Sequence, residues 1–143
     1  MGHSVPIIND HGQKEGSDYY GTMTVDGNCI VVDMKKAYDD FSLKKLERKI
    51  ETFDDSIRIT DSFDFNQSGS YVCRLITYDA PEIKQGEILV GNSVVKFDGD
   101  FWQASVKCEK HTKHMPPEEI NVYIIDLKQI KNVNSLELTL KFD

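Results

Sequence analysis

The sequence predicts an all-β protein, an antiparallel β-sandwich of about ten strands. Short segments in which apolar and polar residues alternate recur roughly every ten residues. Turn-forming residues such as Asp26-Gly27, Gly91-Asn92 and Asp98-Gly99 separate these segments. A chain of 143 residues is long enough for one sizeable core, so residues 1–143 are expected to form a single domain.

The first expected strand is an apolar run at residues 5–8, which a polar turn follows. Residues 19–25 and 28–34 are predicted to pair across Asp26-Gly27, a dipeptide typical of two-residue hairpin turns. Residues 56–65 alternate most clearly, because Ile57, Ile59, Asp61, Phe63 and Phe65 share one face and polar residues share the other.

The segment that follows the second of these strands has two interpretations. A short turn is expected at residues 36–40. Leu43, Leu46, Ile50 and Phe53 then recur with a helical spacing, yet alternate residues of 45–53 also permit a strand. We predict a strand at 45–53, because residues 56–65 need a partner and Asp54-Asp55 is short enough to close a hairpin.

The remaining expected strands are bounded by turns that contain glycine, asparagine or aspartate, and they cover residues 71–78, 87–90, 93–97, 101–108, 121–127 and 136–142. Residues 110–119 contain Pro116-Pro117. Because proline lacks the backbone donor that a strand uses, this segment is predicted to be a loop.

Composition limits the partners and the chemistry. The net charge is −7, from 24 acidic and 17 basic residues, whereas phosphate binding needs clustered cations, so nucleic acid is not expected as a partner. No apolar run reaches the length of a transmembrane helix and no secretory signal is visible, so no membrane contact is expected. Cys29, Cys73 and Cys108 lack metal or redox spacing and lie in apolar contexts, which predicts free thiols buried in strands.

Four segments, taken together, resemble the C-terminal domain of the heparinase II/III family of polysaccharide lyases. They are residues 3–13, where a histidine precedes an apolar run, an asparagine and a glutamine; Val31-Val32-Asp33-Met34 with Ala37-Tyr38; residues 46–53; and Ile59-Thr60-Asp61-Ser62-Phe63-Asp64-Phe65. Their order and spacing carry the resemblance, which covers nearly the whole chain.

The resemblance implies a fold and a function. Members of the family pack an N-terminal α/α toroid domain on an antiparallel β-sandwich, and they cleave heparin, heparan sulfate or alginate by β-elimination between the two domains. This chain would be the β-sandwich of such a protein, with the toroid domain and an acidic polysaccharide as its partners. The compartment of the parent protein stays open, and the periplasm, the outside of the cell and the cell surface are all compatible with the resemblance. The isolated domain would be inactive. No cofactor is implied. Some relatives hold a divalent metal, which stays open for this chain because its ligands are not identifiable from the sequence.

β-Elimination needs a group that neutralises the uronate carboxylate, a base for the adjacent proton and an acid for the leaving oxygen. In the family, the β-sandwich supplies one histidine, and His3 is at the matching position. The resemblance therefore implies that His3 is catalytic, as base or carboxylate neutraliser, and that Asn9 and Gln13 bind substrate. His3 has a simpler alternative explanation, because a Met-Gly-His opening is also typical of an affinity-tag remnant or a frayed terminus.

The other histidines have simpler interpretations. His11 is expected to be a solvated turn residue. His111 and His114 are close enough in sequence to share a zinc ion with nearby glutamates, but a solvated loop is the favoured interpretation.

The alternative function is that of a non-catalytic carbohydrate-binding or structural module. Trp102 and the pair Tyr19-Tyr20 could stack on sugar rings, although a lone tryptophan that opens an alternating strand usually belongs to the core. The sequence has one basic cluster, which consists of Lys44, Lys45, Arg48 and Lys49. It is expected to be ordinary charged surface, with the guanidinium group of Arg48 reaching water.

Overall fold

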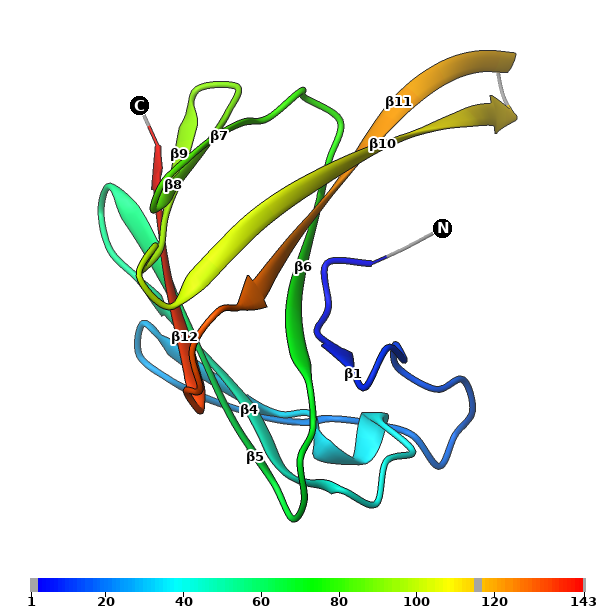
Figure 1. The fold of residues 1–143 in the computed structure, drawn as a ribbon, viewed down its shortest axis with the longest axis vertical. Coiled ribbons are helices and arrows are strands. Elements are labelled where there is room, and N and C mark those ends of the chain that lie inside the picture. Colours follow the sequence, from blue (N-terminus) through cyan, green and yellow to red (C-terminus); the bar gives the residue numbers. More distant parts are fainter. Residues whose placement is uncertain (1–2, 115–116, 143) are drawn as a thin grey trace.

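The computed structural model describes residues 3–114 and 117–142, and it confirms an all-β fold of two antiparallel sheets (Figure 1). The small sheet has four strands in the order β1-β6-β11-β10, and the large sheet has eight in the order β2-β3-β4-β5-β12-β9-β8-β7. The strands are β1 (Ile7–Ile8), β2 (Thr22–Asp26), β3 (Cys29–Asp33), β4 (Leu43–Thr52), β5 (Ser56–Phe65), β6 (Tyr71–Thr77), β7 (Glu82–Lys84), β8 (Glu87–Val90), β9 (Ser93–Lys96), β10 (Trp102–His114), β11 (Pro117–Gln129) and β12 (Ser135–Phe142).

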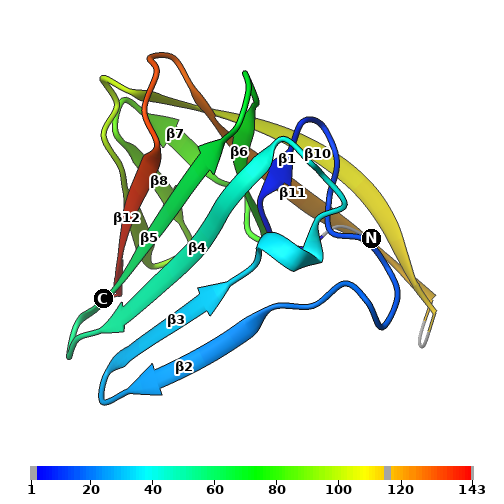
Figure 2. The same cartoon turned by 90° about the horizontal axis from the view of Figure 1, so that it is seen from below.

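The predicted hairpin of β2 and β3 is confirmed, although β2 begins at Thr22, later than expected. Figure 2 shows these two strands at the far end of the large sheet, beside the short helical turn η1 (Lys35–Ala37). Among the described residues, none belongs to a helix long and apolar enough to cross a membrane.

The ambiguous segment at residues 41–53 forms β4, as predicted. Ile50 lies opposite Ile30 of β3 on one side and opposite Ile59 of β5 on the other. Pairing on both edges satisfies the backbone of a central strand, and this outweighs the helical spacing of its leucines.

The prediction of a loop at residues 110–119 is wrong. β10 and β11 pair from Trp102 opposite Gln129 to His114 opposite Pro117, and Pro116 lies outside the described residues. Proline is tolerated at the first residue of a strand, so Pro117 can open β11 without breaking the ladder. The short strand β7 was not predicted either, because three residues give too little alternation to recognise.

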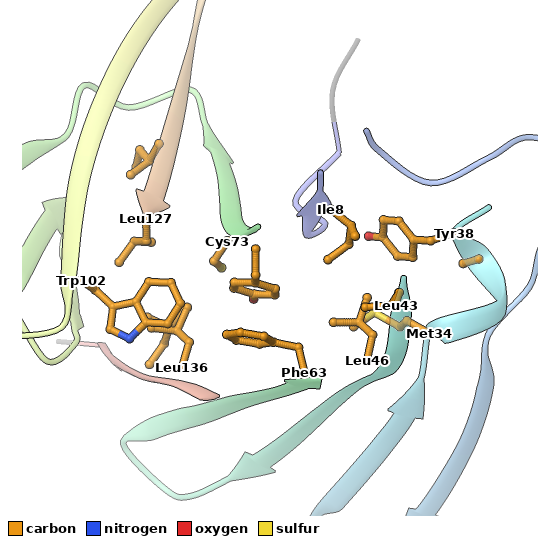
Figure 3. Close-up of a cluster of buried hydrophobic side chains, with 14 of the residues drawn as sticks. Ile8, Met34, Tyr38, Leu43, Leu46, Phe63, Cys73, Trp102, Leu127 and Leu136 are labelled. Carbon is orange, nitrogen blue, oxygen red and sulfur yellow. The ribbon is translucent and has the colours of Figure 1, made fainter. Parts of the chain in front are cut away.

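Aromatic rings occupy the centre of the core between the sheets (Figure 3). Phe63 of β5 and Tyr71 of β6 stack with ring centroids 4.1 Å apart and planes within 3°. Trp102 packs edge-on against both rings and is only 3% exposed, which confirms that it belongs to the core. Aliphatic side chains from both sheets surround the rings: Ile8, Leu43, Leu46, Ile88, Ile125, Leu127, Leu136 and Leu138.

A charged pair is buried beside these rings. Two guanidinium nitrogens of Arg48 each donate a hydrogen bond of 2.7 Å to the carboxylate of Asp61, and the hydroxyl of Tyr71 donates to the same carboxylate. The Arg48 side chain is 13% exposed and that of Asp61 is 1% exposed. The expectation that the Arg48 head reaches water is therefore wrong. Asp61 lies directly opposite Arg48 on the inner face, where a buried carboxylate needs a cation.

This burial changes the proton affinity of the groups involved. Burial lowers the pKa of Arg48, but its hydrogen bonds and charge contact with Asp61 outweigh that effect and raise the pKa overall. Burial raises the pKa of Tyr71 well above its ordinary value. Arg48 is therefore charged and Tyr71 is neutral at ordinary pH.

The three cysteines are free, as predicted, but only Cys73 is buried. Burial raises the pKa of its thiol to about 12. Cys29 in β3 is half-buried and Cys108 in β10 is exposed, so the expectation of three buried thiols is wrong. Cys108 lies opposite Tyr123, where the pairing of β11 with β6 ends, and only a two-stranded ribbon continues from there.

Candidate functional site

The first described residues form one edge of the small sheet. Ile7 and Ile8 pair with Val72 and Tyr71 at the start of β6. Farther along β6, the amide of Ile76 donates to the hydroxyl of Ser4 at 3.0 Å. These contacts hold the N-terminal segment along β6 and place His3, which is exposed as expected, at this edge.

A tight turn then reverses the chain. Ile8 and His11 exchange two backbone hydrogen bonds of 2.8 Å each, and the two residues between them, Asn9 and Asp10, have φ angles of +48° and +65°. Positive φ at both central positions is the geometry of a type I′ hairpin, and asparagine and aspartate are the side-chain-bearing residues that tolerate it best. The turn brings Gln13 back toward the side of the sheet on which His3 lies.

The side chain of Asn9 fixes this turn to the rest of the domain. Its amide nitrogen donates to Asp40 at 2.7 Å and to Ser42 at 3.1 Å, and its carbonyl oxygen accepts from the Ser70 backbone at 2.8 Å. Hydrogen bonds from Ser42 and Asn9 lower the pKa of Asp40. Both ends of the Asn9 amide are thus occupied within the chain, and a substrate-binding role for Asn9 stays a prediction.

A groove of ≈ 450 Å³ lies between the N-terminal segment and the outer face of the small sheet. The N-terminal segment contributes polar side chains to it, those of His3, Asp10, Gln13 and Glu15. The sheet contributes Val72 and Arg74 from β6 and Asp126 and Lys128 from β11. The structure therefore brings His3 and Gln13, two of the three predicted site residues, into one groove, whereas Asn9 is not among the residues that line it.

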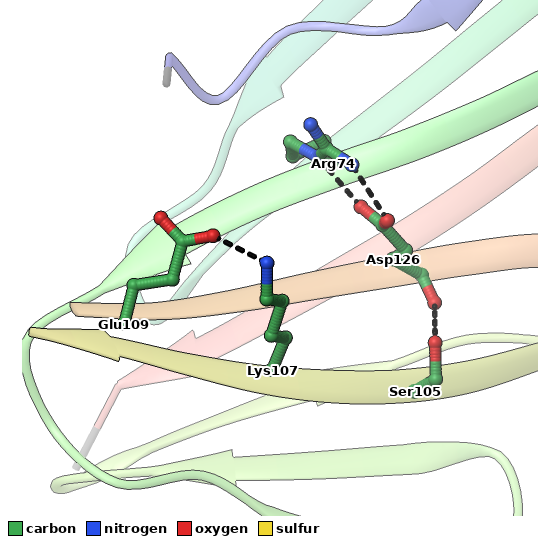
Figure 4. A network of polar contacts seen from close by, with 5 residues as sticks. All are labelled: Arg74, Ser105, Lys107, Glu109 and Asp126. Carbon is green, nitrogen blue, oxygen red and sulfur yellow. Dashed lines mark hydrogen bonds and ion pairs between the residues drawn. The ribbon is translucent and has the colours of Figure 1, made fainter. Parts of the chain in front are cut away.

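The charges in the groove are nearly balanced. Arg74 and Asp126 lie opposite each other on β6 and β11 and form two hydrogen bonds of 2.7 Å (Figure 4). The hydrogen bonds and charge of Asp126 raise the pKa of Arg74. Lys128 has no ion-pair partner among the residues that the structure describes, so it is a cation that an anionic ligand could reach.

Sequence reasoning missed Arg74, Asp126 and Lys128 as groove residues. In residues 71–78 and 121–127 the charges of Arg74 and Asp126 are isolated, because each shares its strand face with apolar neighbours such as Val72 and Ile124. The sequence also carries no signal that these two strands are neighbours or that the N-terminal segment folds along them.

The remaining histidines lie elsewhere. His11 is exposed and lines a neighbouring pocket with Lys14 and Tyr38, which adjoins the groove at Gly12 and Gln13. The Nε2 atom of His111 is 3.4 Å from a carboxylate oxygen of Glu109, and the side chain of His114 lies outside the described residues. Within residues 3–114 and 117–142, no three histidine, cysteine or carboxylate side chains gather as metal ligands would.

The basic cluster is divided between the surface and the core. Lys44, Lys45 and Lys49 each form an ion pair at the surface, with Asp64, Glu47 and Glu51 respectively, and the last of these pairs is half-buried. The expectation of ordinary charged surface is confirmed for these three lysines and wrong for Arg48, which is internal.

The aromatic side chains considered for sugar binding do not share a surface with His3. Trp102 is buried in the core, and neither Tyr19 nor Tyr20 is among the residues that line the groove. The Tyr20 hydroxyl instead accepts a hydrogen bond from Lys36 at 3.1 Å.

Comparison with known sequence families and with curated proteins finds no match. Among solved structures, the chain is similar to heparan sulfate lyase HepC from Pedobacter heparinus and to a mutant of that enzyme. The TM-scores are 0.59 for the enzyme and 0.65 for the mutant, each at 10% sequence identity over 98% of this chain. The chain spans 24% of the length of each lyase chain. At this identity the likeness concerns the fold.

Proposed function

We propose that this chain is the β-sandwich domain of a polysaccharide lyase and forms one wall of a cleft that cleaves uronate-containing polysaccharide by β-elimination. The fold likeness to a quarter of a heparan sulfate lyase supports a domain of a larger protein, and the ordered sequence resemblance supports the same family. An N-terminal α/α toroid domain would form the opposite wall.

The observation that carries the proposal is the shared groove of His3, Gln13 and Lys128. An exposed imidazole can take a proton or stabilise a carboxylate. Lys128 can pair with a uronate or sulfate group, and Gln13 can hydrogen-bond to a hydroxyl. His3 would be the catalytic residue of this wall, and the other two would position the sugar.

The groove also explains why this wall would not act alone. Its two cations, Arg74 and Lys128, are outnumbered by three carboxylates, those of Asp10, Glu15 and Asp126, and the whole chain carries a charge of −7. A polyanionic substrate therefore gains little electrostatic binding energy from this surface. The toroid domain would have to supply both the missing acid and most of the binding energy.

The test is a lyase assay on the protein that joins this chain to its toroid domain, with heparin, heparan sulfate and alginate as substrates. The ultraviolet absorbance of the unsaturated uronate product measures turnover. His3→Ala should lower kcat by about a hundredfold or more, because removal of a general base or a charge stabiliser costs that much. His11→Ala, a nearby exposed histidine outside the groove, is the matched control and should leave kcat unchanged.

The isolated chain should show no turnover in the same assay, because groups that act as a unit lose nearly all activity when separated. Turnover by the isolated chain at the rate of the joined protein would contradict the two-domain proposal. Normal turnover in the His3→Ala protein would instead leave the domain as a non-catalytic wall.

A further inference from the structure

Strand β10 has a long free edge. It is the last strand of the small sheet, and among the described residues only β11 pairs with it. Gln103 and Ala104, at the start of β10, share a pocket with Ile83 and Lys84 of β7, so the free edge begins at about residue 105. Beyond Cys108, where the pairing of β11 with β6 ends, β10 and β11 project from the sandwich as an arm (Figure 1).

The side chains on this edge are accessible. Val106 is 45% exposed, Cys108 is exposed, and the Lys107 side chain is 74% exposed. Lys107 and Glu109 point to the outer face of the sheet, where their side chains lie 2.7 Å apart (Figure 4). An unpaired row of backbone donors and acceptors is a template for another strand unless charges oppose it.

A second copy of the chain can meet this edge only in certain registers. A twofold axis normal to the sheet makes the two β10 strands antiparallel and leaves the outer faces of both copies on the same side. One residue of β10 must then lie opposite the same residue of the second copy, and this residue defines the register. Registers centred on Lys107, Glu109 or Lys110 place like charges opposite each other, which is unfavourable. Registers centred on Ser105 or Val106 bring the occupied start of β10 against the partner strand.

The register centred on Cys108 has neither fault. It places Lys107 of each copy opposite Glu109 of the other, which makes two equivalent ion pairs across the axis. Val106 lies opposite Lys110, whose aliphatic stem can cover it. The sequence Lys107-Cys108-Glu109 is thus complementary to itself in the antiparallel direction.

We propose that two copies of this chain associate edge to edge through residues 105–111 of β10, with the twofold axis at Cys108, so that their small sheets form one continuous sheet. The proposal does not depend on the function proposed above. An interface of this length is small, so the dimer is weak and forms at high protein concentration.

The first test is sedimentation under reducing conditions at protein concentrations up to about 1 mM. The native chain should dimerise with rising concentration. Lys107→Glu and Glu109→Lys should each raise the dissociation constant about tenfold, because each places like charges opposite each other at two positions. The double variant Lys107→Glu/Glu109→Lys should restore the native dissociation constant.

Lys45→Glu is the matched control, because Lys45 and Glu47 form a similar ion pair two residues apart on a strand of the large sheet. It should leave dimerisation unchanged. A native chain that stays monomeric throughout, or a double variant that stays as weak as the single ones, would overturn the proposal.

The second test uses Cys108 as a reporter of register. Residues directly opposite in antiparallel strands have Cα atoms about 4.5 to 5.5 Å apart, within the range of a disulfide. Oxidised glutathione should link two copies through Cys108, as two thiols become one disulfide and the glutathione disulfide becomes two thiols. Cys29→Ser should keep this cross-link and Cys108→Ser should abolish it.

In the Cys108→Ser background, the pair Val106→Cys with Lys110→Cys should restore the cross-link, because the register places these positions opposite each other. Val106→Cys alone should not. Cross-linking by Val106→Cys alone would show a different register and would overturn the proposed axis.

Discussion

Arg48 and Asp61 are cross-strand neighbours that satisfy each other inside the sandwich, with two hydrogen bonds of 2.7 Å. A lone ion at this depth has no water to solvate it. The pair therefore links β4 and β5 through charge as well as through backbone hydrogen bonds, and the Tyr71 hydroxyl connects it to the aromatic stack of Phe63 and Tyr71.

Removal of one member of this pair should be strongly destabilising. We expect Asp61→Leu to lower the free energy of unfolding by about 3 to 5 kcal/mol, because Arg48 would be left buried without a counter-ion. Urea unfolding measures the change. The double variant Arg48→Met/Asp61→Leu should be more stable than Asp61→Leu, and Asp64→Asn, which breaks an exposed pair with Lys44, should have no measurable effect. Equal stability of Asp61→Leu and the native chain would contradict the buried pairing.

The thiols should react in the order of their exposure. In the folded protein at mildly alkaline pH, Cys108 should react rapidly with Ellman's reagent. Cys73 should stay unreactive, because burial excludes the reagent and raises the pKa of the thiol to about 12. Unfolding without reductant should expose three thiols. Fewer than three would show a disulfide that the structure lacks among its described residues.

The contribution of Asp40 to the stability of the folded protein should decrease at acidic pH. Its hydrogen bonds from Ser42 and Asn9 lower its pKa in the folded state below the ordinary value of 3.8. As the pH falls, Asp40 therefore binds a proton at a higher pH in the unfolded chain than in the folded protein. Its contribution to stability is present above pH 3.8 and is lost as the pH falls from 3.8 through the pKa of the folded state. Urea midpoints measured against pH should show Asp40→Asn less stable than the native chain near neutrality, with the gap closing in acid. A gap that stays constant as the pH falls would contradict this role of Asp40.

Lys128 should affect the binding of substrate more than its chemistry. In the protein that carries the toroid domain, Lys128→Ala should raise KM about fivefold and change kcat less, because the lysine pairs with the sugar before and during reaction. Lys131→Ala is the control, since this lysine lies over the Phe101 ring and does not line the groove. A fall in kcat with unchanged KM would contradict the positioning role.

The strands were predictable where alternation and turn residues agree. Residues 56–65 and the hairpin at Gly27 are of this kind. Residues 41–53 could not be assigned from local pattern, because their apolar spacing is helical. They form the strand β4 because β3 and β5 pair with it on both edges. The prolines misled the prediction at residues 110–119, because the effect of a proline on a strand depends on whether it is at the end or in the middle.

The candidate site was predictable only in part. His3 and Gln13 lie close in sequence, and a turn is enough to bring them to one groove. Arg74 and Asp126 are 52 residues apart, so their contact depends on which strands become neighbours. The Arg48 side chain likewise points into the core because the register of β4 and β5 places it opposite Asp61. Hydrophobic periodicity alone does not fix this register.

The strand pairs of both sheets differ in how far apart their strands lie in the sequence, and this sets an order of folding. Hairpins between consecutive strands, such as β4 with β5, β8 with β9 and β10 with β11, cost little entropy to close. The pairs β1 with β6, β6 with β11 and β5 with β12 join strands across long intervening segments. We therefore expect these long-range pairs to form after the hairpins. His3 would then reach its groove only when β1 docks, so the groove would be the last part of the domain to appear during folding.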